Sequence, residues 1–349
     1  MQYLSYGPIT CHIDLDSPGK RFTNINLNYS DNRHSFSSIL IPIAVIKGKD
    51  EGPTVLLSAG NHGDEYEGQC LLRRLIQEIT SEMVKGRVIV LPALNSPAVR
   101  EATRISPLDN GNLNRSFPGA SNAGPTKAIA GFVVEHLFPI ADFGIDFHSG
   151  GSTATYVNTG YLCAAHSPEI HQSNVELVEA FGAPFTMVAP VTDEVVDMDS
   201  AAHQMGLPFI SCELGGAGTI SPSALKCGWE GLMRVLVKNG IINSNSSLFV
   251  DIDGAPQTCF VDMGEKCSVV TAKSDGFFVP SHELGSWVSK GQVASHIYSL
   301  QNTIEPLEEH VFAHDGVIVV KRRDTLVRAG DHLYCVAEKL TRDEVLSIC

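Results

Sequence analysis

The sequence predicts an α/β domain with a largely parallel sheet, followed by a smaller all-β domain. Between residues 53 and 240, short apolar runs alternate with stretches of helical periodicity, as is typical of parallel sheets with helices on their faces. Beyond 257 the helical pattern stops, and short strand-like runs are separated by glycines. We therefore expect a β-rich segment, 1–50, that packs on one of the other two parts, an α/β domain, 51–243, and a C-terminal β domain, 255–349.

The chain is long and apolar enough to fold around a core of its own. It has 349 residues, of which 43% are hydrophobic and 18% charged, as expected for a globular protein. The formal net charge of -14 argues against nucleic acid and anionic membranes as partners, because both require clustered lysines and arginines. A local cationic pocket is still compatible with this balance.

Within the α/β region, the elements follow from the spacing of apolar residues. TVLLSA (54–59) is a short apolar run that suits a buried strand, and leucines and isoleucines recur at helical spacing after Gln69. Residues 95–123 are rich in Asn, Pro, Ser and Gly, so we expect them to form a long loop. A loop of this length in a compact domain is usually functional. By the same criteria we expect strands over 37–48, 87–94, 142–147, 184–190 and 208–213, and helices over 69–83, 125–138, 168–181 and 223–240.

The C-terminal region contains two weakly similar halves. AKSDGFFVP with VSKGQVASHI, and AHDGVIVVK with VRAGDHLYCV, each place Asp-Gly before one strand-like run and Gly before the next. Such repetition of short strands predicts a small β-barrel or β-sandwich. Residues 242–257 are the expected linker between this part and the α/β domain.

The cysteines and the N-terminus indicate the compartment. The nine cysteines are scattered and include no C-x-x-C pair, which argues against a structural zinc site built from cysteines. Free thiols suit a reducing compartment. The N-terminus has no basic start followed by an apolar stretch, and no run of about 18 apolar residues occurs. We expect a cytoplasmic protein without a membrane span, and the sequence leaves a homo-oligomer open.

His62 and Glu65 follow the strand expected at 54–59, where a helix begins. A step of three residues lets both side chains converge on one point, and imidazole and carboxylate are suitable zinc ligands. The glycines around them permit tight turns. Asp64 and Glu67 are rival carboxylates that we rank lower. The alternative is a solvated histidine and glutamate in a loop.

Two more candidates stand at the ends of apolar strands. His148 ends DFGIDFH, with Asp146 two residues earlier on the same face as a carboxylate that could orient a neighbouring group. Glu213 ends PFISCE, and a carboxylate in such surroundings can have a raised pKa and act as a general base. The alternatives are a buried histidine bonded to the backbone and a carboxylate that caps a turn.

Arg104 and Arg115 lie in the long loop and are cations in an acidic protein. Arginine can bind a carboxylate through two hydrogen bonds and can stabilise an oxyanion. Structural salt bridges are the alternative.

Four motifs occur in order: GNHGDEYEG, NLNRSFPG, DFHSGG and CELGG. Together they resemble the succinylglutamate desuccinylase and aspartoacylase family, a branch of the zinc carboxypeptidase superfamily. The resemblance covers about 53–240 and extends loosely to the C-terminal region. It implies a zinc-carboxypeptidase-like sheet, mixed but largely parallel and flanked by helices, followed by a barrel-sandwich-like β domain.

The resemblance also implies a mechanism. His62, Glu65 and His148 would hold one Zn2+ per chain, and Glu213 would be the general base that activates water. The α/β domain would then be a catalytic domain that hydrolyses the amide bond of a small N-acyl amino acid. The corresponding product is a free amino acid together with a small carboxylic acid.

On the substrate side, the resemblance assigns Asn114 and Arg115 to the α-carboxylate and Arg104 to the scissile carbonyl. The family motif usually reads DLNR, and here Asn112 replaces the aspartate, which could loosen the loop that carries Arg115.

A second departure concerns the substrate side chain. Aspartoacylase-type enzymes use an additional arginine before the position of Glu213. This chain has the acidic stretch TDEVVDMDS (192–200) there, and the next Lys or Arg after it is Lys226. The acidic residues there would repel a dicarboxylate and favour an ammonium group, with Asp193 and Glu194 as the candidates for substrate binding. The stretch contains Asp193, Glu194, Asp197 and Asp199. A solvated, acidic helix N-terminus is the alternative.

We therefore expect a substrate with a neutral or cationic side chain. The resemblance is strongest to a subfamily that deacetylates N-alpha-acetyl-L-2,4-diaminobutyrate in ectoine breakdown. The alternatives are a desuccinylase or aspartoacylase acting on a dicarboxylic substrate, a metallocarboxypeptidase, and a non-catalytic protein that binds metal and ligand. The C-terminal domain has no lysine at SDG (274–276) or HDG (314–316), so we expect it to be structural or to rim the pocket.

Overall fold

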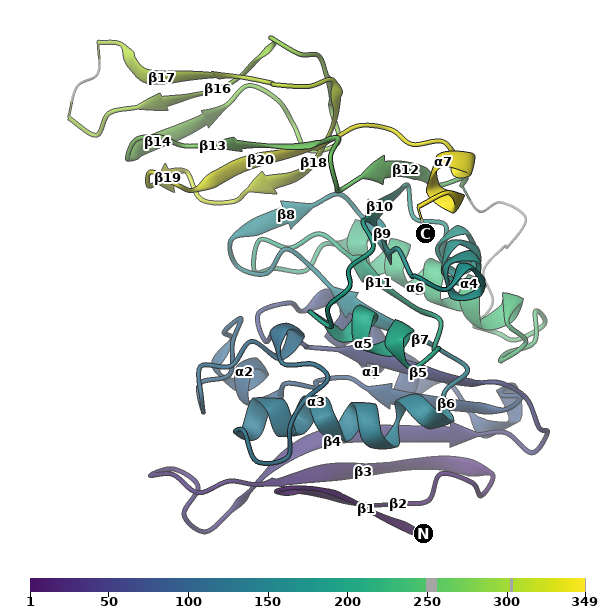
Figure 1. Cartoon of the computed structure of the whole chain (residues 1–349). Helices are drawn as coiled ribbons and strands as arrows, with labels where there is room; N and C mark the ends of the chain where they lie inside the picture. Colours follow the sequence, from purple (N-terminus) through teal and green to yellow (C-terminus); the bar gives the residue numbers. More distant parts are fainter. Residues whose placement is uncertain (249–255, 302–303, 349) are drawn as a thin grey trace.

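The protein consists of a main body built on one large sheet and a smaller β domain that projects from one end of it (Figure 1). The computed structural model describes residues 1–248, 256–301 and 304–348. Within these residues, no helix is long and apolar enough to cross a membrane. The predicted α/β fold with a C-terminal all-β domain is confirmed.

The large sheet has eleven strands in the order β1-β2-β3-β4-β6-β5-β7-β11-β9-β10-β12. Its four central strands, β6, β5, β7 and β11, run parallel, while β1 to β4 add to one side as antiparallel neighbours. The strands are β1 (Gln2–Tyr6), β2 (Ile9–Ile13), β3 (Gly19–Asn28), β4 (Ser38–Lys47), β5 (Thr54–Ala59), β6 (Arg87–Leu91), β7 (Phe143–His148), β9 (Thr159–Cys163), β10 (Phe185–Ala189), β11 (Phe209–Glu213) and β12 (Cys259–Asp262).

Helices cover both faces of this sheet, and successive residues of the buried strands alternate between two cores. One core packs against α1, α4 and α6, and the other packs against α3 and α5, which lie in front of the sheet in Figure 1. The helices are α1 (Glu67–Glu78), α2 (Ser96–Glu101), α3 (Pro125–His136), α4 (Pro168–Phe181), α5 (Met198–Gln204), α6 (Pro222–Lys238) and α7 (Arg342–Leu346), with 3-10 turns at Ser81–Met83, Leu113–Arg115 and Phe138–Ile140.

Gly68, in the first turn of α1, lets this helix approach the sheet closely. A Cβ atom at this position would lie 2.2 Å from the Cβ atom of Phe147 on β7, well inside van der Waals contact. The start of α1 is thereby held against the end of β7. This contact brings the loop between β5 and α1 next to the residues that follow Phe147.

The C-terminal domain is built from the two similar halves found in the sequence. In each half the short middle strand pairs with the first strand of the other half, so β19 pairs with β14 and β15 pairs with β18. Strand β8 of the main body also pairs with β18. The strands are β8 (Ala154–Tyr156), β13 (Cys267–Thr271), β14 (Gly276–Pro280), β15 (Trp287–Val288), β16 (Val293–Tyr298), β17 (Pro306–Val311), β18 (Gly316–Arg322), β19 (Leu326–Val327) and β20 (His332–Ala337).

Some elements of the structure differ from those expected from the sequence. The long loop over 95–123 contains α2 and a 3-10 turn, and a helix, α7, does form in the C-terminal region, where Thr341 and Glu344 cap its N-terminus. Strand β9 and helix α5 were not among the expected elements. The three-part division of the chain stays a prediction, although β4 pairs with β6 across its first boundary. Residues 249–255 of the expected linker lie outside the described residues.

We predict that Gly68→Ala lowers the free energy of unfolding by about 1–3 kcal/mol, because the added methyl group overpacks the contact with Phe147. Urea denaturation of the metal-free protein measures this change. Gln77→Ala, on the exposed side of the same helix, is the control and should change stability by less than about 0.5 kcal/mol. Equal stability of the two variants would contradict the proposed packing constraint.

Candidate active site

The candidate residues converge at the carboxyl ends of the central parallel strands, where open α/β sheets commonly place their ligand sites. Strand β5 leads into the loop that carries His62 and Glu65, and the neighbouring strand β7 ends at His148. Strand β11 lies on the other side of β7, and its last residue, Glu213, is the register partner of His148. Three separate chain segments therefore meet at one place.

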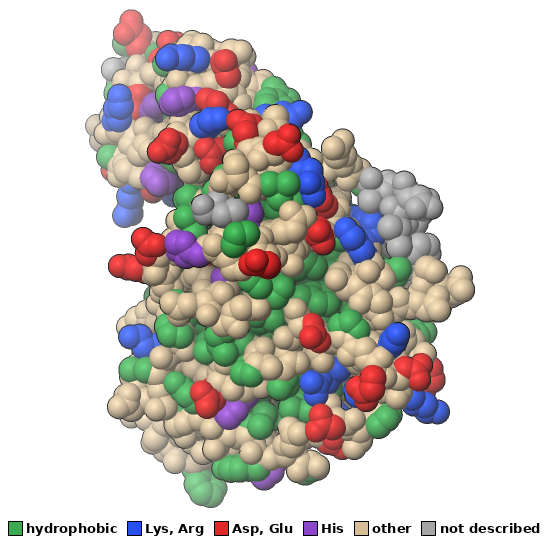
Figure 2. All heavy atoms as spheres, turned by 45° about the vertical axis from the view of Figure 1, so that its right-hand side comes forward, with side chains coloured by type: hydrophobic (Ala, Val, Ile, Leu, Met, Phe, Trp, Pro, Cys, Tyr) green, Lys and Arg blue, Asp and Glu red, His purple; other side chains and the backbone are tan. Residues whose placement is uncertain are grey.

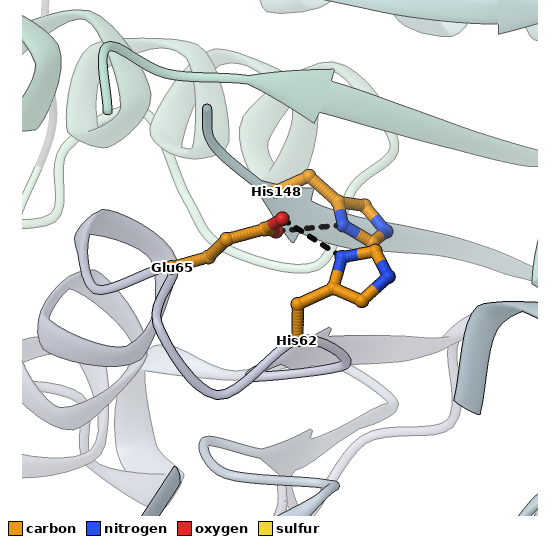
Figure 3. A group of neighbouring side chains, drawn as sticks. All are labelled: His62, Glu65 and His148. Atoms are coloured by element: carbon orange, nitrogen blue, oxygen red, sulfur yellow. Dashed lines mark hydrogen bonds and ion pairs between the residues drawn. The ribbon is translucent and has the colours of Figure 1, made fainter. Parts of the chain in front are cut away.

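Figure 3 shows how His62, Glu65 and His148 lie, with both imidazole rings directed at the carboxylate of Glu65. His62 Nδ1 is 2.8 Å from Oε1 and His148 Nδ1 is 2.9 Å from Oε2. All three side chains are buried, and their candidate ligand atoms lie within 4.8 Å of one another. The structure thus brings the three predicted ligands together in a group that could hold a metal ion.

The other ring nitrogen, Nε2, also has an oxygen neighbour in each histidine. His62 Nε2 is 3.1 Å from Asn112 Oδ1, and His148 Nε2 is 2.8 Å from Asp146 Oδ2. The amide oxygen at His62 Nε2 favours the tautomer that carries its proton there, which leaves Nδ1 with a lone pair for a metal. At His148, the contact between Nε2 and Asp146 is an ion pair. This donor set, with its oriented rings, fits a divalent ion such as zinc. The side chain of Asn112 thus contacts His62, while its backbone carbonyl oxygen accepts the N–H of Arg115 over 3.0 Å. That this residue loosens the loop of Arg115 stays a prediction.

The charges of this group are strongly coupled. Burial alone would lower the pKa of His148, but the carboxylates of Asp146 and Glu65 outweigh it and raise the pKa well above its usual range. Burial would likewise raise the pKa of Glu65, yet His148 and His62 bring it below its usual range. Without a metal, His148 thus carries a proton between two ionised carboxylates.

The rival carboxylates Asp64 and Glu67 accept hydrogen bonds from the surrounding loops. Asp64 Oδ2 accepts a hydrogen bond of 2.8 Å from the backbone N–H of Ser152, and Glu67 Oε1 accepts one of 3.0 Å from that of Gly216. Neither belongs to the group of potential metal ligands. Both bonds hold the glycine-rich turns that follow β7 and β11, so these carboxylates shape the rim of the site.

A cavity of about 370 Å³ opens over the His62–Glu65–His148 group. Its volume lies in the range of small-molecule sites. Most of the predicted site residues line this cavity, and strand β8 and the segment after β12 complete its wall through Tyr156 and Met263. The lining residues that the argument uses are Arg104, Asn114, Arg115, Glu213, Asp197 and Asp199.

Arg104 and Glu213 lie beside the three candidate metal ligands. Arg104 Nη1 is 3.3 Å from Glu65 Oε1, while the rest of the side chain is half exposed. Glu213 has a carboxylate oxygen that is buried and has no hydrogen-bond partner among the described residues. Burial and the nearby charge of Glu65 raise the pKa of Glu213 well above its usual range, against the opposing charges of His148 and Arg104. A carboxyl group whose pKa is raised in this way is suited to accept and return a proton.

Asn114 and Arg115 stand next to each other at the cavity wall. Asn114 Oδ1 accepts hydrogen bonds of 3.2 Å from Asn61 Nδ2 and from the backbone N–H of Met198, which leaves the amide N–H groups to face a ligand. Arg115 is exposed, and its guanidinium donates to the carbonyl oxygen of Asn114. The pair offers donors that suit a carboxylate.

The structure does not bring Asp193 and Glu194 into this cavity. Both are exposed, both line a separate hollow, and Asp193 Oδ1 lies 3.1 Å from His166 Nε2 at the surface. The reason is local, because the chain runs along the surface after β10 and turns inward only where α5 begins. Asp197 and Asp199, in the same acidic stretch, reach the cavity instead.

A signal for this turn exists in the sequence. Asp197 is the N-cap of α5, and its carboxylate accepts the backbone N–H of Ser200, three residues on. Asp followed by Ser at this spacing is a helix-start pattern. It places Asp199 in the first turn, two residues inside the helix.

Comparison with known proteins agrees with this geometry. Residues 51–238 match the succinylglutamate desuccinylase/aspartoacylase catalytic domain. The chain is 33% identical over 331 residues to the N-alpha-acetyl-L-2,4-diaminobutyric acid deacetylase of Halomonas elongata, and the match covers 95% of each chain.

Two solved structures are equally similar in fold. The product-bound ectoine utilization protein EutE of Ruegeria pomeroyi has a TM-score of 0.88 and 33% identity, with 96% of this chain and 100% of that chain covered. A succinylglutamate desuccinylase from Silicibacter has a TM-score of 0.88 and 31% identity, with 97% and 100% covered. The fold similarity alone therefore does not distinguish between the activities that these two names describe.

We predict that the affinity for zinc rises with pH. Metal binding requires neutral imidazole, and the carboxylates beside His148 hold its pKa well above the usual range. Below that raised pKa a proton must leave, so the affinity should fall by up to about tenfold for each pH unit of acidification. Competition with a chelator at several pH values measures the affinity, and calorimetry in two buffers counts the released protons.

Asp146→Asn is the matched control for this prediction. It keeps a side chain of the same shape behind His148 but removes a charge that raises the pKa of that histidine. The pH range over which affinity changes should then move to lower pH. An affinity that is independent of pH in the unaltered protein would contradict the charge assignment.

Proposed function

Because this chain belongs to the succinylglutamate desuccinylase/aspartoacylase family, a family of hydrolytic enzymes that act on N-acyl amino acids, we propose that the cavity is the active site of a zinc-dependent deacetylase. We propose N-alpha-acetyl-L-2,4-diaminobutyrate as its substrate. Hydrolysis of the amide bond would release acetate and 2,4-diaminobutyrate. Three kinds of residue support this assignment: metal ligands, a proton carrier and groups that select the substrate.

In this proposal His62, Glu65 and His148 hold the metal through the two Nδ1 atoms and the Glu65 carboxylate. Bound zinc would lower the pKa of water and polarise the acyl oxygen. Asp146 and Asn112 keep the rings in the required orientation through their contacts with Nε2. The buried positions of the three ligands support a fixed geometry.

Glu213 is proposed to take the proton from the attacking water and to give it to the leaving amine. Its raised pKa and its unpartnered oxygen at the cavity support both transfers. Arg104 is placed to stabilise the negative charge that develops on the acyl oxygen, since its guanidinium lies beside Glu65 at the ligand group. Tyr156 also lines the cavity close to Glu213.

The charge balance of the cavity carries the substrate assignment. Asn114 and Arg115 are proposed to bind the α-carboxylate, and Arg104 is committed to the acyl oxygen. The lining contains no further lysine or arginine among the described residues, so a second carboxylate would have no cation to bind. It would instead face Asp197 and Asp199, and such repulsion discriminates between substrates as effectively as attraction.

The alternative functions account for fewer of the residues that line this cavity. A desuccinylase or aspartoacylase would need a third cation, and a non-catalytic binding protein would have no need of Glu213. A carboxypeptidase would share the metal ligands and the α-carboxylate grip but would have to accommodate a peptide. The eight described cysteines are free, which supports the cytoplasmic location that we also propose.

We predict that a panel of acylated amino acids separates these functions. N-alpha-acetyl-L-2,4-diaminobutyrate should be hydrolysed with the highest kcat/KM, ahead of N-acetylaspartate and succinylglutamate, because only the dicarboxylates meet the acidic wall without a counter-charge. Acetate and succinate release are measured with the metal content of the same sample. Preference for either dicarboxylate would refute the proposed substrate.

We also predict that Glu213→Gln lowers kcat by roughly a hundredfold or more, the usual contribution of a positioned general base. Bound metal should stay at one equivalent, because Glu213 is not among the potential ligands. Glu135→Gln makes the same change of charge at an exposed position of α3 and is the control. If Glu213→Gln turns over substrate at the normal rate, the proton carrier is another group.

A further inference from the structure

Asp199 is a buried acidic side chain that lines the active-site cavity and that the proposed catalytic steps do not use. Only 3% of the residue is exposed. Ser211 Oγ donates a hydrogen bond of 2.8 Å to Asp199 Oδ2, while Oδ1 has no partner among the described residues. An unpaired carboxylate oxygen in a buried position is costly unless a ligand or a proton occupies it.

A second carboxylate lies beside it. The side-chain oxygens of Asp197 and Asp199 come within 4.8 Å of each other, and both residues line the cavity. Burial and the charge of Asp197 raise the pKa of Asp199 well above its usual range. A cation placed between the two carboxylates would offset this repulsion.

The acidic pair lies next to the proposed α-carboxylate grip. Met198 lies between Asp197 and Asp199, and its backbone N–H donates to Asn114 Oδ1 over 3.2 Å. The acidic pair therefore begins next to the residue proposed to hold the α-carboxylate. A substrate held there by its α-carboxylate would therefore have these carboxylates beside it, and a short side chain that ends in an ammonium group would meet them.

We infer that Asp199, assisted by Asp197 and Ser211, is the subsite that binds the terminal ammonium group of the substrate and so sets its specificity. This inference rests on the proposed deacetylase function. An alkylammonium has three N–H donors and no acceptor. Asp199 Oδ1, the Asp197 carboxylate and the lone pairs of Ser211 Oγ offer acceptors to match.

A divalent metal is the competing occupant, because Cys163, Asp197 and Asp199 are also close enough to hold one. The chemistry of the group favours the ammonium. A metal would need the thiolate of Cys163, and burial together with Asp199 and Asp197 raises the pKa of this thiol well above its usual range. Asp197 also already caps α5 through its carboxylate.

The test compares Asp199→Asn on two substrates of equal shape. N-alpha-acetyl-L-2,4-diaminobutyrate and N-alpha-acetyl-L-norvaline differ in a terminal ammonium against a methyl group. We expect Asp199→Asn to lower kcat/KM on the order of a hundredfold for the first substrate, as for loss of one partner in a buried charged contact. The change for the second should stay within about threefold, which is roughly the scatter between independent contacts.

Binding without turnover gives a second readout. Calorimetry should show that Asp199→Asn weakens the binding of L-2,4-diaminobutyrate but not that of L-norvaline. Ser211→Ala keeps both carboxylates and should lower kcat/KM selectively for the ammonium substrate by about tenfold, as for one hydrogen bond to a charged group. This variant tests the subsite even if Asp199→Asn fails to fold. Glu135→Gln is the control for net charge.

The outcomes separate the two proposals. If the unaltered enzyme prefers N-alpha-acetyl-L-2,4-diaminobutyrate but Asp199→Asn affects both substrates alike or neither, the function stands and the subsite is refuted. If the unaltered enzyme prefers a dicarboxylate, both fall. A second bound metal equivalent that is lost in Asp199→Asn would show that the pair holds a metal, which also overturns the ammonium subsite. Selective loss for the ammonium substrate establishes it.

Discussion

The buried carboxylate of Glu65 is the group on which the rest of the site depends. It faces an imidazole nitrogen on each side, 2.8 Å from His62 and 2.9 Å from His148, in a place where an unpaired charge would be strongly destabilising. These contacts join the loop after β5 to the end of β7. Asp146 and Asn112 then hold the outer nitrogens of the two rings. Since both nitrogens of each ring have a polar neighbour, the candidate ligands are positioned in the absence of a metal, and preorganisation of this kind is what a metal site requires.

The cavity above this group has hydrogen-bond donors in one part of its wall and carboxylates in another. Arg115 and the Asn114 amide lie where an acidic group would be held, and Asp197 and Asp199 lie at the start of α5, which a backbone hydrogen bond ties to Asn114. A ligand with opposite charges at its two ends would satisfy both parts at once. One with two negative ends would satisfy only the first. Two residues of the acidic stretch thus enter the cavity, where we propose that they contribute to selectivity, while its exposed members stay in solvent.

Much of the fold could be predicted, because it depends on local patterns. The apolar run of β5 and the spacing of α4 give bounds that agree with the structure. Strand β9 was missed because it inserts between β11 and β10, antiparallel to one and parallel to the other, and no local pattern encodes such a neighbour. In the site, the candidate metal ligands, which the structure brings together, follow from motif and strand position. Asp199 could not be separated from Asp193 by charge alone, since only the start of α5 turns the former inward.

Asn112 alters the electrostatics of the metal group. The position usually holds aspartate in the family motif, and here an amide oxygen contacts His62 Nε2 instead. The carboxylates of Glu65 and Asp146 alone would then balance the two charges of a zinc ion, once His148 has released its proton. An aspartate at 112 would add a third negative charge to the group and make the bound ion a weaker electrophile. The amide therefore keeps the contact with His62 Nε2 without adding a charge. In the proposed mechanism, a bound ion would then stay more strongly positive and would take a larger share than Arg104 in neutralising the developing oxyanion.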